Sequence, residues 1–188
     1  AGAVRYEGAP PPHGGLQLEA PVHGNAAHAA VPATGIDALQ GAVAIMNQLY
    51  AENRRYQGIT SRVAGITHPY LNIGRVEGGT NTNVIPGKVV FKLDRRMIPE
   101  ENPADVEALI RQVIADAVDG FNAGRPDDGI HVDIKRLLLA NAMTPLSGNA
   151  PLVEAIQKHG EAVFGDLPAA VGTPLYTDVR LYVERGIP

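Results

Sequence analysis

The sequence predicts an α+β protein whose larger part folds as a ferredoxin-like domain with the element order β-α-β-β-α-β. Several short segments alternate apolar and polar residues, as strands do, and two longer segments repeat their apolar residues at helical spacing. Clusters of Gly, Pro, Asn and Asp separate these segments. We therefore expect a four-stranded antiparallel sheet with two helices on one face.

The first strand is predicted at 15–23, where apolar and more polar residues alternate. Residues 1–14 end in a Pro/Gly run and are interpreted as a linker. A helix is predicted over 34–55, with Thr34 as its N-cap. Its apolar residues at helical spacing are Ile36, Leu39, Val43, Met46 and Tyr50, and Ala38, Ala42 and Ile45 widen the surface. A helix this apolar typically covers two neighbours, such as its own sheet and a partner chain.

Two strands follow at 69–77 and 84–96, joined by the sequence GGTNTN. The second helix is expected to begin after Asn102 as its N-cap, with Pro103 in the first turn. The residues expected on its apolar face are Val106, Leu109, Val113 and Ala117. A last strand is predicted from Ile130, Val132, Ile134 and Leu137, which closes a domain at 15–139.

The segment 140–188 does not continue this pattern. A third helix is expected to start at Asn149 and Pro151 and to run through Phe164, with Gly165 as its stop signal. The chain then ends after Gly-Ile-Pro without completing a further strand. We interpret 140–188 as a fragment of a second domain.

The composition makes some classes of function unexpected. A hydrophobic fraction of 45% and a charged fraction of 19% are typical of a soluble globular protein. The net charge is −4, with no basic stripe, so we expect no nucleic-acid partner. No apolar run reaches the roughly 18–20 residues that span a membrane, so we expect no membrane partner. The start of the chain does not resemble a signal peptide and the chain has no Cys, so we expect a cytoplasmic location. With zero Cys, any metal would need His and carboxylate ligands.

Four stretches carry a family resemblance: HGNAAHAAVPATGIDAL (23–39), GGTNTNVIPG (78–87), FKLDRRMIPEENP (91–103) and YTDVRLYVERGIP (176–188). In this order, around this element pattern, they resemble the zinc-dependent metallopeptidase and amidohydrolase family of acetylornithine deacetylase, succinyl-diaminopimelate desuccinylase and aminoacylase. The resemblance implies an enzyme that hydrolyses an N-acyl amino acid or small peptide bearing a carboxylate.

The resemblance also implies two domains. An α/β catalytic domain holds two zinc ions, and a smaller lid domain inserted in it pairs with the lid of a second subunit to form a homodimer. The family's metal motifs, an early His-x-Asp, a Glu-Glu pair with the general base and a late His, lie outside the match. We therefore expect 15–139 to be the lid and 140–188 to be a catalytic-domain fragment. No zinc ligand is expected in this chain, and the chain alone should be inactive.

By resemblance, His28 reaches the partner's active site and stabilises the developing oxyanion. A donor placed where charge develops in a transition state contributes about 2.7–4 kcal/mol. The alternative is a loop histidine that satisfies nearby backbone groups.

Two further residues are assigned to substrate binding by resemblance, Asn83 and Arg96. Asn83 offers a donor and an acceptor, although an Asn in such a loop often bonds its own backbone. Arg96 can bind a carboxylate through two parallel hydrogen bonds. The alternative for Arg96 is a surface ion pair with Asp94 or Glu100, which contributes at most about 1 kcal/mol.

Thr177 and Asp178 match the family's Gly-Thr-Asp-Arg loop near the substrate, but Leu175 and Tyr176 replace the preceding glycines. The segment His131-Val132-Asp133 has the spelling of the family's zinc motif. It falls in the last predicted strand, where Val132 takes the buried face and His131 and Asp133 point outwards together. We interpret it as a solvated strand face rather than a metal site.

Two other functions stay open at this point. The domain could be a stand-alone ferredoxin-like module that binds or regulates through a ligand. It could also be a purely structural dimerisation module, with His28 and Asn83 as ordinary loop residues.

Overall fold

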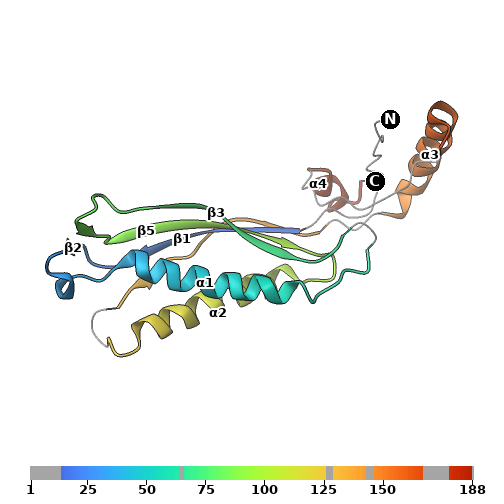
Figure 1. Ribbon diagram of the computed structural model, residues 1–188. Coiled ribbons are helices and arrows are strands. Elements are labelled where there is room, and N and C mark those ends of the chain that lie inside the picture. The colour runs from blue at the N-terminus through green and yellow to red at the C-terminus, as the bar shows by residue number, and fades with distance from the viewer. Residues whose placement is uncertain (1–13, 64–65, 126–128, 143–145, 167–177, 188) are drawn as a thin grey trace.

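An antiparallel sheet covered on one face by two helices forms the larger part of the protein. The computed structural model describes residues 14–63, 66–125, 129–142, 146–166 and 178–187. Its strands are β1 (Gly14–His23), β3 (Tyr70–Gly78), β5 (Lys88–Met97), β6 (His131–Val132) and β7 (Lys135–Ala140). They lie in the order β3-β5-β1, and β6 and β7 both pair with the free side of β1. Helices α1 (Ala38–Tyr56) and α2 (Pro103–Asn122) lie on one face (Figure 1). The predicted fold class is confirmed.

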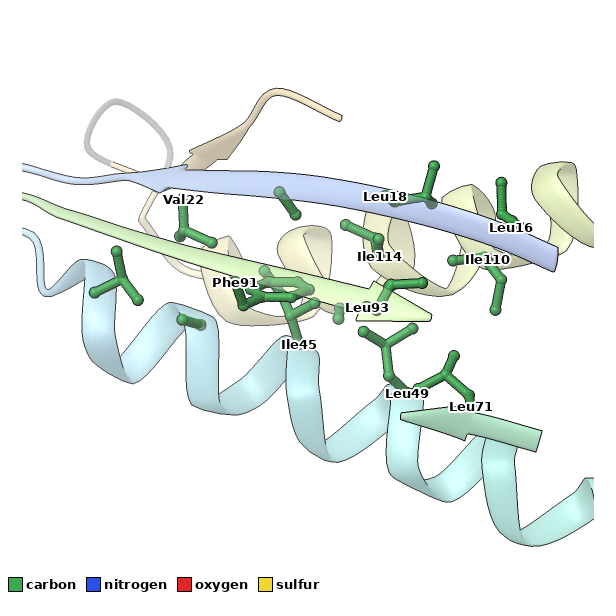
Figure 2. Close-up of a cluster of buried hydrophobic side chains, with 14 of the residues drawn as sticks. Leu16, Leu18, Val22, Ile45, Leu49, Leu71, Phe91, Leu93, Ile110 and Ile114 are labelled. Atoms are coloured by element: carbon green, nitrogen blue, oxygen red, sulfur yellow. The ribbon is translucent and has the colours of Figure 1, made fainter. Parts of the chain in front are cut away.

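The central pair β1–β5 builds the core. It runs in unbroken antiparallel register from Gly14 opposite Met97 to His23 opposite Lys88. Because side chains alternate between faces, one face of this pair is apolar and the other is polar. Figure 2 shows the apolar face meeting both helices, with Phe91 beside Ile45 of α1. The buried strand residues are Leu16, Leu18, Ala20, Val22, Val89, Phe91 and Leu93.

Helix α1 begins later than predicted, at Ala38 instead of 34. Asp37 is the N-cap, and its Oδ1 accepts hydrogen bonds from the N–H groups of Leu39 (2.8 Å) and Gln40 (3.1 Å). Thr34 instead ends the short 3₁₀ turn η1 (Pro32–Thr34). The helix cannot start at Thr34 because Ile36 is held in an isolated bridge with Asn25.

The buried face of α1 also differs from the predicted one. The residues in the core are Ala38, Ala42, Ile45, Leu49 and Tyr56, while Leu39, Val43 and Tyr50 are about two-fifths exposed. Small alanines near the N-terminus of the helix let it approach the sheet closely. The larger side chains of the predicted stripe are therefore left on the outer side, available to another surface.

The segment predicted as one strand over 84–96 is two strands. β4 (Val84–Ile85) pairs with β2 (Ala27–His28) in a separate two-stranded ribbon, and β5 starts at Lys88. Pro86 interrupts the strand because it has no N–H to donate. Its carbonyl instead accepts a hydrogen bond from the N–H of Ala38 at 2.9 Å.

Helix α2 begins as predicted, with the Asn102 side chain accepting from the N–H of Ala104 at 2.9 Å. Its core residues are Val106, Ile110, Ile114 and Ala117, whereas Leu109 is exposed and Val113 is only partly buried. The last predicted strand is broken into β6 and β7, and Leu137, expected in its apolar pattern, is exposed. In α2 the buried residues Ile110 and Ile114 therefore lie one position after Leu109 and Val113, which the sequence pattern predicted.

Beyond the sheet lie two more helices, α3 (Ala150–Phe164) and α4 (Val179–Val183). Helix α3 matches the predicted third helix, and Gly165 ends it with a positive φ of 81°. Both helices lie past one end of the sheet, away from the face that α1 and α2 cover (Figure 1). None of the described residues of α3 or α4 is buried. No described helix is long and apolar enough to cross a membrane.

Arg95 is a charged residue on the core face of β5 and is fully buried. Its guanidinium lies over the Tyr56 ring, 4.1 Å from the centroid, and donates to the Glu101 carboxylate at 2.5 Å. Glu101 also accepts from the N–H of Ile98 at 2.9 Å. This cluster connects the end of β5 to α1 and to the start of α2.

The Arg95–Glu101 pair gives a stability prediction. Glu101→Ala should lower the free energy of unfolding by about 3 kcal/mol, because it leaves a buried guanidinium without its carboxylate. Urea unfolding followed by circular dichroism measures the change. Glu77→Ala removes the exposed partner of Arg75 and should leave the curve unchanged. Equal effects of the two substitutions would contradict this role for the buried pair.

Candidate functional site

The β2–β4 ribbon brings His28 and Asn83 together. His28 lies opposite Val84, and the N–H of Ala29 donates to the carbonyl of Asn83 at 2.9 Å. The two residues come from distant loops of the sequence and become neighbours through this pairing. The ribbon extends past one end of the main sheet (Figure 1).

Glycines allow the two loops to approach each other at the base of the ribbon. The N–H of Gly24 donates to the carbonyl of Gly87 at 2.9 Å. A Cβ at Gly87 would lie 2.9 Å from the backbone N of Ala26, so a side chain there would push the loops apart. In the GGTNTN turn, Gly79 has φ +79°, which L side chains rarely adopt. A Cβ at Gly78 would lie 2.7 Å from the Lys88 carbonyl oxygen.

The His28 imidazole is oriented by a local backbone contact. Its Nδ1 accepts a hydrogen bond from the N–H of Ala30 at 3.1 Å. A neutral imidazole that accepts at Nδ1 carries its proton on Nε2. His28 is exposed, so Nε2–H is an outward-facing donor. Satisfying the backbone at one nitrogen thus leaves the other nitrogen available to a ligand.

Asn83 is exposed beside it. Within the described residues, its side-chain amide has no hydrogen-bond partner, so the self-bonded turn that sequence reasoning left open is not formed. A hollow of about 340 Å³ lies beside β4, with Gly79, Thr80 and Val84 in its lining. Neither His28 nor Asn83 lines this hollow. Both side chains point out from the domain rather than into a cavity of the same chain.

Arg96 lies on the polar face of the sheet near the far end of β5. It is eight positions after Lys88, which places it about 27 Å along the strand from the ribbon. Its Nε donates to Asp94 Oδ2 at 2.6 Å, so the surface ion pair considered from sequence is present. Arg95 and Arg96 face opposite sides of the sheet, as predicted. The structure therefore brings His28 and Asn83 together but does not bring Arg96 to them within one chain.

The polar face around Arg96 carries paired charges. Lys92 Nζ lies 2.7 Å from Glu19 Oε2, and its hydrogen bond holds the pKa of Glu19 below its ordinary value. The Gln17 amide donates to Asp94 at 3.3 Å. In this network Arg96 donates a hydrogen bond only through its Nε. The two terminal amino groups of its guanidinium have no hydrogen-bond partner in the described part of the chain.

Two predicted site residues lie in the C-terminal segment. Thr177 is outside the described residues. Asp178 is exposed at the start of α4 and makes no capping hydrogen bond with its side chain.

Among the described residues, one group of three metal-binding side chains is found: His23, His131 and Asp133. It lies between β1 and β6, and sequence reasoning did not include His23 because only strand pairing brings it there. Two zinc ions need more ligands than these three residues offer. The described residues therefore do not fit the two-zinc centre that the resemblance implies.

An exposed apolar surface lies along α1 and the edge of the sheet. Leu39, Val43 and Tyr50 of α1 are exposed, and so is Val76 of β3. Strand β3 is at the edge of the sheet, and α1 packs against it. An edge strand has unpaired backbone N–H and C=O groups and can accept another strand. We refer to these four side chains and the β3 edge as the α1–β3 surface.

The His28 geometry predicts a tautomer. Long-range ¹H–¹⁵N correlation spectra of the imidazoles should show the neutral imidazole of His28 protonated on Nε2. The exposed His68, which lies outside the helices and strands, serves as a reference within the same chain. A His28 protonated on Nδ1 would contradict the contact with Ala30.

Comparisons with known proteins bear on the family and the fold. The peptidase dimerisation domain family matches residues 13–121, which include β1 to β5 and nearly all of α2. An uncharacterized hydrolase of Sinorhizobium fredii, y4tI, is 32% identical over 108 residues, 57% of this chain and 24% of that protein. The chain thus spans about a quarter of the length of this relative.

Solved structures share the fold at low identity. A tripeptidase from Staphylococcus aureus matches with a TM-score of 0.63 and 18% identity, over 95% of this chain and 42% of its own. A hydantoinase/carbamoylase family amidase from Burkholderia ambifaria matches with a TM-score of 0.63 and 21% identity, over 96% of this chain and 40% of its own. The fold match therefore extends past the dimerisation domain into residues 140–188. Since the family match covers more than half of the sequence, this chain belongs to the peptidase dimerisation domain family, which confirms the resemblance predicted from the sequence.

Proposed function

We propose that the chain is the lid and dimerisation region of a metal-dependent hydrolase that cleaves the amide bond of an N-acyl amino acid or small peptide. The whole enzyme would act as a homodimer with two zinc ions in each catalytic domain, outside the residues described here. The observation that carries the proposal is the position of His28 and Asn83 as neighbours on the β2–β4 ribbon, at the end of the sheet farthest from the points where the chain enters and leaves the domain.

The position of the β2–β4 ribbon supports a role for His28 and Asn83 in the active site of a partner subunit. The chain enters the domain at Gly14 and leaves it after Ala140, and these residues lie near each other because Gly15 pairs with Ala140. Any domain formed by the flanking sequence connects at that end. His28 and Asn83 lie at the opposite end of the β1–β5 ladder and point outwards. In a two-fold pair, these side chains would therefore contact the second subunit.

The chemistry of the two residues suits an amide substrate. The Nε2–H of His28 is a donor already oriented by the backbone, which reduces the cost of ordering it during the reaction. It would donate to the carbonyl oxygen as negative charge develops there. The Asn83 amide can both donate and accept, so it would hold the substrate amide or carboxylate beside His28.

Arg96 would bind the substrate carboxylate within its own subunit. It lies beside Gly15, close to the end where the flanking segments connect. Its Nε is held by Asp94, and its two terminal amino groups are available for a carboxylate. Asp94 would therefore orient the guanidinium rather than neutralise a surface charge. Thr177 and Asp178 are proposed to lie near the same substrate in the catalytic domain.

The α1–β3 surface is the proposed dimer contact. Its edge strand and its exposed apolar side chains lie side by side, so a second copy could bury both at once. The match to a dimerisation domain family supports the proposed homodimer, and the choice of this surface is argued from its exposed side chains. A cytoplasmic location and the absence of nucleic-acid partners remain predictions.

Replacement of His28 tests the catalytic role. In the full-length enzyme, His28→Ala should lower kcat by about 100-fold or more, because one donor to the oxyanion is lost. Steady-state kinetics on N-acyl amino acids measures the effect, and His68→Ala is the matched control. Unchanged kcat in a dimeric His28→Ala enzyme would favour the purely structural dimerisation module.

Charge placed on the α1–β3 surface tests the dimer contact. Val43→Asp should convert the dimer to a monomer, because the carboxylate would be buried against apolar side chains of the second copy. Light scattering coupled to gel filtration gives the mass. Leu109→Asp is the control, since Leu109 on α2 is similarly exposed but lies outside this surface. A Val43→Asp protein that remains dimeric would place the interface elsewhere.

A further inference from the structure

We propose that His23, His131 and Asp133 form a binding site for one divalent transition-metal ion of the zinc class on the lid domain. The sequence alone favours a solvated strand face for His131 and Asp133, and the neighbouring His23, which strand pairing adds, is the observation that changes this interpretation. This site does not depend on the proposed function. The site lies at the end of β1, where β6 pairs with β1, and its side chains leave the polar face of the sheet.

Strand pairing brings the three residues together. His23 and His131 are direct partners in the antiparallel register, so their side chains leave the same face of the sheet. Their rings stack, with centroids 4.6 Å apart and planes within 8° of each other. The N–H of Asp133 donates to the carbonyl of Pro21 at 3.2 Å, which continues the pairing. The positions of all three residues are thus set by the backbone.

The available ligand atoms suit a borderline metal ion. Two imidazole nitrogens and one carboxylate oxygen lie within 4.8 Å of one another, and His23 Nε2 is 3.4 Å from Asp133 Oδ2. A bound ion needs each ligand atom at about 2.0–2.2 Å, so the stacked rings must turn toward a common point. His131 and Asp133 are exposed and have room for this rotation. Water or a further ligand would complete the tetrahedral set.

Two features of the surroundings affect the affinity. Asp133 contributes a negative charge that offsets part of the charge of the ion. Lys88 opposes it, because it is the partner of His23 on the β5 side and its side chain leaves the same face. Lys88→Gln should therefore tighten metal binding, which distinguishes a real cation site from a neutral ring stack.

A bound ion would affect the ribbon that carries His28. His23 directly precedes Gly24, whose N–H holds the base of the ribbon through the Gly87 carbonyl. Cross-linking β6 to β1 at His23 would fix the strand that leads into this ribbon. The site would thereby stabilise the end of the sheet from which His28 and Asn83 project.

Calorimetric titration of the purified 188-residue chain with Zn²⁺ tests the proposal, and Co²⁺ absorption spectra report the ligand geometry. We expect one ion per chain at this site. Each of His23→Gln, His131→Gln and Asp133→Asn should weaken binding by at least about tenfold. His68→Gln, which removes an exposed histidine outside the group, should leave the affinity unchanged. Circular dichroism of each variant verifies that it is folded.

Two outcomes would overturn the proposal. The first is the absence of Zn²⁺ and Co²⁺ binding up to millimolar concentration, in which case His23 and Asp133 form only an ion pair. The second is binding that survives His131→Gln unchanged, which would assign the metal to other residues. Neither outcome bears on the kinetics of the His28→Ala enzyme, so the two proposals fail independently.

Discussion

The unbroken antiparallel ladder between β1 and β5 is the constraint on which the rest of the structure depends. Its register places every second side chain of both strands on the helix-covered face, where Leu16, Leu18, Phe91 and Leu93 are buried. A slip of one residue in either strand would move the buried side chains of that strand to the polar face. The same register places Arg96 at one end of the sheet and His23 at the other. The β1–β5 register therefore sets both the packing of the core and the positions of these polar residues.

This ladder also separates the functional candidates. The ribbon at one end holds His28 beside Asn83, while the opposite end holds Arg96 and the connections to the flanking sequence. These ends lie about 27 Å apart along β5, so one chain does not bring the three residues to one ligand. Two copies related by a two-fold axis can place the ribbon of one beside the flanking domain of the other. Dimerisation would then be part of the site and not only of the assembly.

Polar residues within the domain serve different physical roles. Arg95 is buried, stacked on Tyr56 and paired with Glu101, so it contributes to the connection between β5 and the helices. Its neighbour Arg96 faces the other side and keeps two amino groups available. Asp94 and Glu19 pair with Arg96 and Lys92 on that polar face. Strand alternation alone explains why adjacent arginines in the sequence have such different environments.

Sequence by itself determined the order of the elements, the strand alternation in β1 and β5, and the cap of α2, because these follow from local periodicity and local backbone chemistry. It also marked His28, Asn83 and Arg96, through motifs. It did not determine the start of α1, since the bridge between Ile36 and Asn25 is a tertiary contact that competes with helix formation. Nor did it determine which stripe of α1 is buried, because alanines and leucines both fit helical spacing and only packing against the sheet selects between them. The pairing of His28 with Val84, which brings His28 near Asn83, and the pairing of His23 with His131 were decided by strand register between distant segments. The pattern of residues along the sequence does not specify that register, because the register depends on which strands become neighbours when the core forms.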